Sequence, residues 1–305
     1  MVVVTVDVGG MYSAGKSTII NDFLKLFPKK ELITSSNYCN VINGESTAKH
    51  KDRSGISRVL FDDLQILVGN EWITDNNGKI VYGEVVGPNS NPFLSEFVFL
   101  FQEVNRYLTM SDLCEGFEGD SLVVNDLSFW DSYKMFIPTF HDFNKGVVGK
   151  CFDEKMSVSD LQAVKEVIGL DLKDYTSFSK LDVLEHFYSN PYLVKGLGEG
   201  DVSLSDLKPD SYIILTVDPG VCVLRAENRC REDLDSLGEG DIRYPAILKE
   251  KVESFYGDYP SWNSLLIDTT NNSKSDVFNS FVSELFSVLR AKNVSSSALE
   301  QILKK

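Results

Sequence analysis

Cysteine and histidine are scarce in this chain of 305 residues, and neither is spaced for metal binding. No two cysteines form a C-x-x-C pair, and the three histidines are scattered along the sequence. The cysteines are Cys39, Cys114, Cys151, Cys222 and Cys230, and the histidines are His50, His141 and His186. An odd number of cysteines without paired spacing argues against a disulfide framework and a cysteine zinc site. We therefore expect a reduced, intracellular setting.

Positive charge and long apolar runs are also lacking. Acidic residues outnumber basic residues by 45 to 30, which gives a formal net charge of −15. Because non-specific affinity for nucleic acid comes from Lys and Arg that neutralise phosphates, this charge argues against a nucleic-acid partner. No apolar run approaches the roughly 20 residues that cross a bilayer. The chain opens directly on its first expected strand, so we expect no leader peptide, no membrane partner and a cytoplasmic location.

The N-terminal segment carries the strongest motif of the sequence. The β-branched run from Val2 to Val8 predicts a strand, and helical spacing follows from Ser17 to Leu26. Between them, the residues Gly10-Met11-Tyr12-Ser13-Ala14-Gly15-Lys16-Ser17 fit the phosphate-loop pattern G-x-x-x-x-G-K-[ST]. A chance glycine-rich turn would rarely have strand, loop, lysine, serine and helix in register. The motif therefore predicts a binding site for a nucleoside triphosphate.

The residue types of the loop match the chemistry of phosphate binding. Gly10 and Gly15 let the backbone wrap a phosphate without a Cβ in the way, and the backbone N–H groups there suit an anion. Lys16 supplies a point charge for the β- and γ-phosphates, and Ser17 can offer its hydroxyl to Mg²⁺. The residues predicted to bind the nucleotide are Gly10, Ser13, Ala14, Gly15, Lys16, Ser17 and Thr18.

A second predicted strand, Ser121 to Asp126, ends in an acid. In phosphate-loop folds, an aspartate at the end of a neighbouring strand is expected on the Mg²⁺ side of the site. We therefore predict Asp126 as a metal ligand together with Ser17. A helix N-cap is the alternative role for Asp126, and the two roles do not exclude each other.

An arginine-rich helix is expected after the strand Ser211 to Val217. This helix, from Val221 to about Asp235, carries three arginines: Arg225, Arg229 and Arg231. Arginine suits the clamping of a transferring phosphoryl group, and this helix leaves the carboxyl edge of the same predicted sheet. The alternative is a solvated helix laced by salt bridges, which the neighbouring acids support.

The remaining segments predict an α/β architecture in a single domain over residues 1–305. Strands are expected at 31–35 and 265–268, and helices at 57–68, 93–114, 155–172, 180–188, 244–256 and 275–289. The turn signal Asn76-Asn77-Gly78 predicts a hairpin. Residues 46–90 and 141–208 are expected to be insertions on the nucleotide-binding core.

The order of these segments resembles the deoxyribonucleoside kinase family, the relatives of animal and viral thymidine and deoxyguanosine kinases. The stretch from Cys222 to Asp233 is similar to that family's lid, R-x-x-x-R-x-R-x-E-E. Phe101-Gln102 resembles the base-reading helix, and Asp126-Leu127-Ser128 stands where the family has Glu-Arg-Ser. The resemblance covers separate islands and leaves 46–90 and 141–208 uncovered.

The resemblance implies a three-layer P-loop NTPase fold with a five-stranded parallel sheet, a helical lid over residues 225–243, and ATP with Mg²⁺ as cofactors. The implied catalytic residues are Lys16, Asp126, Arg225, Arg229 and Arg231. The implied substrate-binding residues are Phe101, Gln102, Trp130 and Asp233, with Gln102 on the nucleobase edge.

The sequence departs from the family pattern at three places. Leu127 replaces the arginine of the Glu-Arg-Ser motif, and Leu234 replaces the lid acid that touches the sugar. The family's general base, a glutamate at the end of strand two, has no counterpart in the residues 35–38. A base from another position would be Asp7, Glu45 or Asp126.

We expect a phosphotransferase that moves the γ-phosphoryl group of ATP to the 5′-hydroxyl of a deoxyribonucleoside. The absent glutamate supports an alternative, a deoxynucleoside monophosphate kinase, because a phosphate acceptor is already ionised and needs no base. A catalytically silent nucleotide-binding homologue is the third hypothesis, and a kinase acting on DNA is disfavoured by the charge. A homodimer is compatible with each hypothesis, and no sequence feature specifies the oligomeric state.

Overall fold

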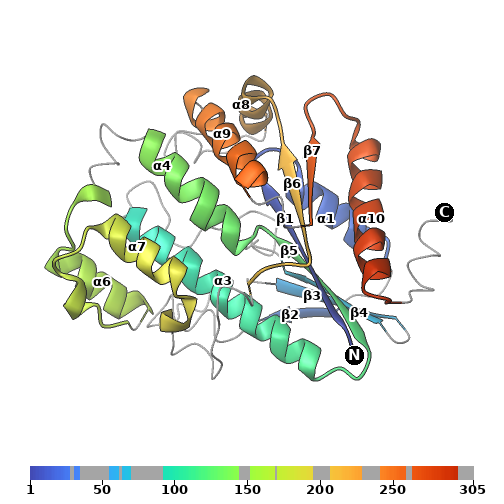
Figure 1. Cartoon of the computed structure of the whole chain (residues 1–305), viewed down its shortest axis with the longest axis horizontal. Coiled ribbons are helices and arrows are strands. Elements are labelled where there is room, and N and C mark those ends of the chain that lie inside the picture. Colours follow the sequence, from blue (N-terminus) through green and yellow to red (C-terminus); the bar gives the residue numbers. More distant parts are fainter. Residues whose placement is uncertain are drawn as a thin grey trace.

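The central element is one sheet of seven strands in the order β2-β3-β4-β5-β1-β6-β7 (Figure 1). The computed structural model describes residues 1–27, 31–34, 55–61, 64–69, 92–143, 152–168, 170–194, 207–228, 241–258 and 263–294. The strands are β1 (Val3–Gly10), β2 (Glu31–Thr34), β3 (Gly55–Phe61), β4 (Leu64–Gly69), β5 (Asp120–Asp126), β6 (Ser211–Thr216) and β7 (Ser264–Asp268).

Five neighbouring strands, from β4 to β7 across the sheet, are mutually parallel. This confirms the predicted five-stranded parallel sheet. The strands β3 and β2 extend it on one edge, and both pairings there are antiparallel. The parallel strands are nearly continuous apolar runs, as expected for strands covered on both faces. With the phosphate-loop sequence between β1 and α1 (Lys16–Lys25), this is the fold of a P-loop NTPase.

The helix predicted for residues 57–68 is wrong, because this segment forms the strands β3 and β4. They pair antiparallel from Ile56 opposite Gly69 to Phe61 opposite Leu64. All six residues of β4 are buried. A short, fully buried run shows no alternation, so its periodicity does not distinguish a strand from a helix. The correction matters for function, because β4 and not β2 is the parallel strand next to β5.

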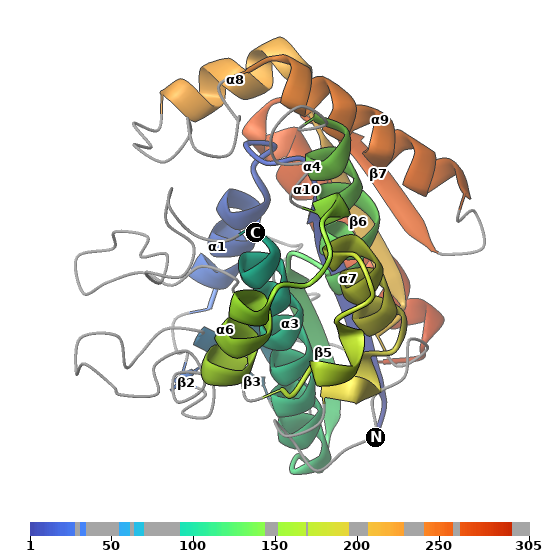
Figure 2. The same cartoon turned by 90° about the vertical axis from the view of Figure 1, so that its left-hand side faces the viewer.

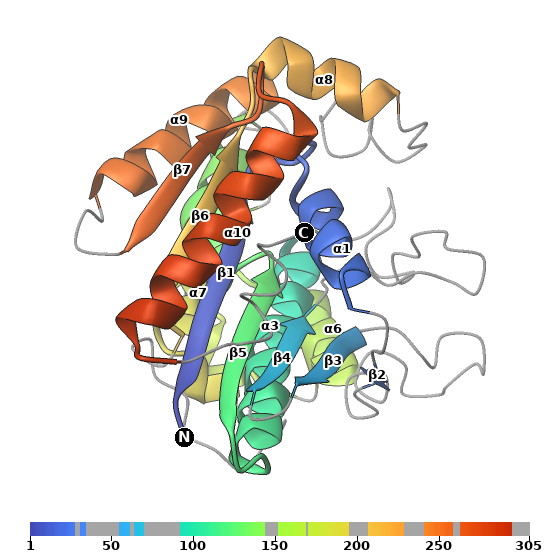
Figure 3. The ribbon, with the colours of Figure 1, turned by 90° about the vertical axis from the view of Figure 1, so that its right-hand side faces the viewer.

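Helices cover both faces of the sheet. On one face, α1 packs against α10 (Lys274–Ala291) (Figure 3). The rings of Phe23 and Phe281 meet there edge to face at 5.7 Å. On the other face lie α3 (Pro92–Glu115), the π-helical turn η2 (Asp131–Phe136), α4 (Ile137–Phe143) and α9 (Arg243–Asp258). Helix, sheet and helix therefore form the three predicted layers.

A small helical unit covers α3 from outside (Figure 2). It contains α6 (Val158–Ile168) and α7 (Lys180–Ser189), with short 3-10 turns at Lys173–Tyr175 and Pro191–Val194. Both helices contact α3, and the rings of Phe97 and Phe187 meet at 5.1 Å. The buried Lys180 pairs with Asp160 at 3.1 Å and joins the two helices. The helices predicted in this region are confirmed, with α6 starting and ending within the predicted range.

The expected lid is described only in part. Helix α8 (Pro219–Glu227) begins at the N-cap Asp218, whose carboxylate accepts hydrogen bonds from the N–H groups of Gly220 and Val221. Residues 229–240 of the expected lid and the expected hairpin around 76–78 lie outside the described residues. None of the helices in the described ranges is long and apolar enough to cross a membrane.

Candidate nucleotide-binding site

The phosphate loop leaves the carboxyl end of β1 in a conformation that two glycines permit. Gly10 and Gly15 have φ angles of +104° and +100°, in the left-handed region that favours glycine. A Cβ on Gly10 would overlap the backbone carbonyl of Leu215 in β6. The N–H of Met11 donates to that same carbonyl at 2.9 Å. The loop is therefore fastened to β6 at a point where only glycine fits.

Lys16 begins α1 and turns its ammonium group into the loop. Its Nζ donates to the carbonyl oxygens of Gly10 at 3.0 Å and Met11 at 2.9 Å, and the side chain is buried. A buried ammonium held by backbone carbonyls is available to an anion that enters the loop, because carbonyl partners carry no charge. This arrangement suits the predicted role of Lys16 toward phosphates.

Asp126 faces α1 from the end of β5, beside Val8 of β1. Its side chain is 1% exposed and hydrogen-bonds Ser17, and its Oδ1 has no hydrogen-bond partner among the described residues. Burial raises the pKa of this carboxyl, and the charge of Lys16 and the bond to Ser17 oppose the shift. A buried carboxylate oxygen without a donor, next to a serine hydroxyl, fits a hard cation with oxygen ligands such as Mg²⁺.

The opposite face of the sheet carries a row of mostly polar residues, one from each of five neighbouring strands. The strand register aligns these residues, which are Gly69, Asn125, Asp7, Tyr212 and Ser264. Asp7 accepts hydrogen bonds from Nδ2 of Asn125 at 2.7 Å and from Oγ of Ser128 at 2.5 Å. Burial raises the pKa of Asp7 to about 6, although both hydrogen bonds lower it. Because Asp7 points away from the Lys16 face and is already hydrogen-bonded, this geometry does not favour it as the base.

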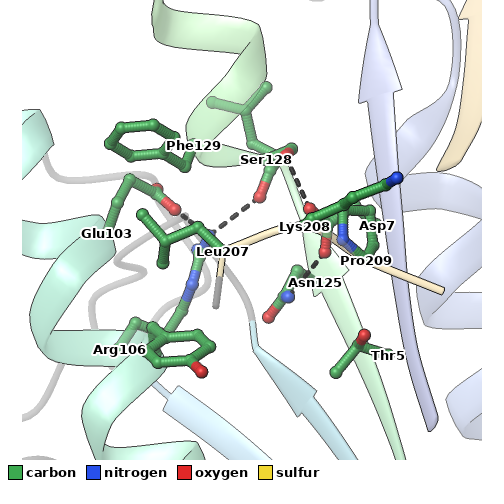
Figure 4. Close-up of a pocket in the computed structure, with 12 residues that line it drawn as sticks. Thr5, Asp7, Glu103, Arg106, Asn125, Ser128, Phe129, Leu207, Lys208 and Pro209 are labelled. Carbon is green, nitrogen blue, oxygen red and sulfur yellow. Dashed lines mark hydrogen bonds and ion pairs between the residues drawn. The ribbon is translucent and has the colours of Figure 1, made fainter. Parts of the chain in front are cut away.

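A buried ion pair from α3 completes this polar layer (Figure 4). Arg106 pairs with Glu103, and its guanidinium also donates to the carbonyl oxygens of Asp126 at 3.3 Å and Leu127 at 2.8 Å. Burial raises the pKa of Glu103 to about 7 against the lowering effect of Arg106. A Cβ on Gly69 would overlap the side chains of Met110 and Arg106, so glycine there leaves space for both residues of α3 against the sheet.

These groups line a pocket between α3, the sheet and the segment that precedes β6 (Figure 4). Its walls include Thr5, Asp7, Glu103, Arg106 and Lys208. The pocket therefore lies on the α3 face of the sheet, whereas Lys16, Ser17 and Asp126 meet near α1. Leu127, which separates the two regions, has a φ of +68° and is held by the hydrogen bond of its N–H to Val8.

Asp131 links the phosphate loop to the turn after β5. Its Oδ1 accepts a hydrogen bond from the N–H of Gly10 at 2.6 Å, and its Oδ2 accepts one from the N–H of Ser128 at 2.8 Å. The side chain is completely buried. Sequence analysis missed Asp131, Glu103 and Arg106 as site residues. The available signal for the α3 pair was an acid and a base three positions apart in the middle of a helix rich in large apolar residues.

The other predicted site residues are only partly brought together. Arg225 donates to Oγ1 of Thr269 at 3.0 Å and to the carbonyl of Thr269 at 2.7 Å, so it ties α8 to the end of β7. Trp130 is buried and donates its indole N–H to the carbonyl of Leu207 at 3.0 Å. Phe101 and Gln102 lie on α3, but the structure does not describe their side chains. Arg229, Arg231 and Asp233 lie outside the described residues. Their roles stay predictions.

No family model and no curated protein matches this chain. Among solved structures, it is similar to deoxyadenosine kinase from M. mycoides with bound dATP, at 15% identity and a TM-score of 0.46 over 92% of this chain and 98% of the other. The same kinase with bound dCTP matches at 16% identity and a TM-score of 0.39, covering 93% and 99%. Its complex with the products dCMP and dCDP matches at 15% identity and 0.40, with the same coverage.

Proposed function

We propose that this chain is an ATP-dependent phosphotransferase that phosphorylates a deoxyribonucleoside at its 5′-hydroxyl. The observation that carries the proposal is the meeting of Lys16, Ser17 and the partnerless oxygen of Asp126 at the carboxyl ends of β1 and β5. The loop N–H groups and Lys16 would hold the β- and γ-phosphates. Ser17 and Asp126 would hold Mg²⁺, which supplies charge neutralisation for the transferring phosphoryl group.

The sheet order suggests where a base for the acceptor hydroxyl lies. The resemblance expects a glutamate after the second parallel strand, and in this sheet that strand is β4. Glu71 follows the last residue of β4, Gly69, by two positions in the sequence, although it lies outside the described residues. Strand β2, which is followed by ten residues without an acid (35–44), is two strands further out. We therefore assign the base to Glu71, which favours a nucleoside over a monophosphate as acceptor.

ADP formation from ATP and Mg²⁺ tests the reaction, with a panel of deoxynucleosides and their 5′-monophosphates as acceptors. Turnover of nucleosides is the expected result. Turnover of monophosphates alone would replace the proposal by a nucleotide kinase. ATP binding without turnover of either class would point to the silent homologue.

The variant Glu71→Gln tests the assignment of the base. It should lower turnover of nucleosides by about a hundredfold, the usual contribution of a general base. Glu45→Gln is the matched control, since Glu45 is an alternative base candidate, and it should keep wild-type activity. The assignment fails if Glu45→Gln loses activity and Glu71→Gln does not.

A further inference from the structure

We propose that Asp131 is a positioning residue that sets the spacing between the phosphate loop and Asp126. It lies outside the predicted catalytic and nucleotide-binding set, and the inference rests on the proposed function for its relevance to ATP. Its two carboxylate oxygens join two backbone segments that carry the two halves of the site. One segment is Gly10, where the loop begins, and the other is Ser128, two residues after Asp126.

The geometry makes this link a rigid one. The carboxylate accepts one backbone N–H on each oxygen, at 2.6 Å and 2.8 Å, so both its position and its plane are fixed. Hydrogen bonds from backbone donors to a buried carboxylate are charge-assisted and stronger than neutral ones. The link also joins the ends of the neighbouring strands β1 and β5, because β1 leads into the phosphate loop and β5 ends at Asp126. A shift of either strand end would break one of the two bonds.

The carboxylate of Asp131 lies close against the backbone of β1 at Gly9. A Cβ on Gly9 would overlap both Oδ2 of Asp131 and the hydroxyl of Tyr212. The glycine that precedes the motif therefore leaves the space that these two groups occupy. Burial raises the pKa of Asp131, and the charge of Lys16 and the two backbone N–H groups oppose this. The charge of Lys16 thus opposes the raised pKa of two buried carboxyls, Asp126 and Asp131.

A carboxylate suits this place because each of its two oxygens faces a backbone N–H donor, and the hydroxyl of Tyr212 lies beside them as a further hydrogen-bonding group. Asparagine has nearly the same shape but offers one acceptor oxygen, so one backbone N–H would face an amide N–H₂ group. The buried donor would then lose its partner. We expect Asp131→Asn to loosen the start of the loop and to disturb the joint action of the loop and the metal ligands.

Hydrogen exchange of the purified chain tests the link without nucleotide. Exchange of a peptide that includes residues 9–17 should become at least about tenfold faster in Asp131→Asn, as expected for losing one charge-assisted hydrogen bond. Asp160→Asn is the matched control, because Asp160 is equally buried but pairs with Lys180 in the outer helical unit. It should leave this peptide unchanged. Equal protection of the loop in wild type and Asp131→Asn would overturn the proposal.

A titration with ATP in the presence and absence of Mg²⁺ tests the consequence. The factor by which Mg²⁺ tightens ATP binding should fall by about tenfold in Asp131→Asn and stay constant in Asp160→Asn. Equal losses in both variants would indicate a general effect on stability and overturn the positioning role. If wild-type protein bound no ATP, the proposed function would fail, and the exchange experiment would still decide the link. Should Asp131→Asn not fold, Asp131→Ser replaces it in both experiments, because serine removes the buried charge and keeps one acceptor.

Discussion

The guanidinium of Arg106 donates a hydrogen bond of 2.8 Å to the carbonyl oxygen of Leu127, the position where the resemblance expects an arginine. Arg106 comes from the middle of α3, and its charge is shared with the buried Glu103. A positive group thus lies against the turn after Asp126 although the turn itself carries none. Through this contact, the pair of Glu103 and Arg106 supports the turn after Asp126.

Breaking this ion pair should be costly, whereas removing both partners should not. Arg106→Met leaves the carboxylate of Glu103 buried without its cation, and we expect a loss of about 3 kcal/mol in the free energy of unfolding. The double variant Glu103→Leu/Arg106→Met should recover most of that loss. Urea unfolding measures both. Lys25→Met, which removes an exposed partner of Asp22, is the control and should change little. Equal stability of Arg106→Met and the control Lys25→Met would contradict a buried pair.

Asp7 should make the protein less stable as pH rises. Because burial raises its pKa from 3.8 to about 6, the folded chain keeps a proton that the unfolded chain releases between these values. The stabilisation from this proton is lost as pH rises through that window. Asp7→Asn, which stays neutral, should therefore gain about 1–3 kcal/mol relative to wild type between pH 4 and pH 7. Chemical unfolding across this range measures the difference.

The matched control for this prediction is Asp174→Asn, which removes the same charge at an exposed position. Its stability relative to wild type should vary much less over the same pH range. A constant difference between Asp7→Asn and wild type from pH 4 to pH 7 would show that Asp7 is ionised throughout.

Gly9→Ala should destabilise the chain and weaken nucleotide binding together. The added methyl group would overlap the carboxylate of Asp131 and the hydroxyl of Tyr212, and both of these side chains are fully buried. We expect a loss of about 3 kcal/mol in the free energy of unfolding, the size of an overpacked core. Gly257→Ala in α9 is the control, because a Cβ there meets no heavy atom within 4 Å. The control should be neutral or slightly stabilising, and an equally mild effect at Gly9 would contradict the crowding.

Lys16→Ala should abolish ATP turnover and leave a folded protein. The loss should exceed about a hundredfold, as for other groups that stabilise charge in a transition state. The same variant removes the cation that opposes the raised pKa values of Asp126 and Asp131, so both carboxyls should become easier to protonate. Lys25→Ala at the exposed end of α1 is the control for helix and charge. ADP release with a thermal unfolding check separates activity from folding, and an active Lys16→Ala variant would refute the role of the loop.

Much of the fold follows from local sequence patterns. The phosphate loop, the acid-ended strand β5 and the long helices α3 and α10 were predicted within a few residues of their bounds. Each has a signal within one segment, such as a motif or sustained periodicity. The strand β4 was predicted as a helix because a fully buried run has no periodicity that separates the two. That error also misplaced the second parallel strand, which is β4.

The meeting of residues was predicted where a motif exists and missed where only the register of strands creates it. Lys16, Ser17 and Asp126 belong to recognisable motifs, and the structure brings them together. Asp131 accepts a hydrogen bond from the N–H of Gly10, which lies 121 positions earlier in the chain. Arg106 of α3 packs against the sheet at Gly69 of β4, where the absence of a side chain leaves space. No pattern within one segment encodes such contacts, since they depend on which residues meet after the strands align.

The polar row from Gly69 to Ser264 also favours the correct register of the strands when the sheet forms. Parallel strands form late because they join distant parts of the chain, and a slip by one residue exchanges the two faces of a strand. Such a slip at β1 would turn the carboxyl of Asp7 toward the apolar layer beneath α1 and α10, without Asn125 or Ser128 as partners. A sheet in the wrong register would therefore bury a carboxyl without hydrogen-bond partners, which costs free energy. The residues that shape the site thus also disfavour wrong strand pairings during folding.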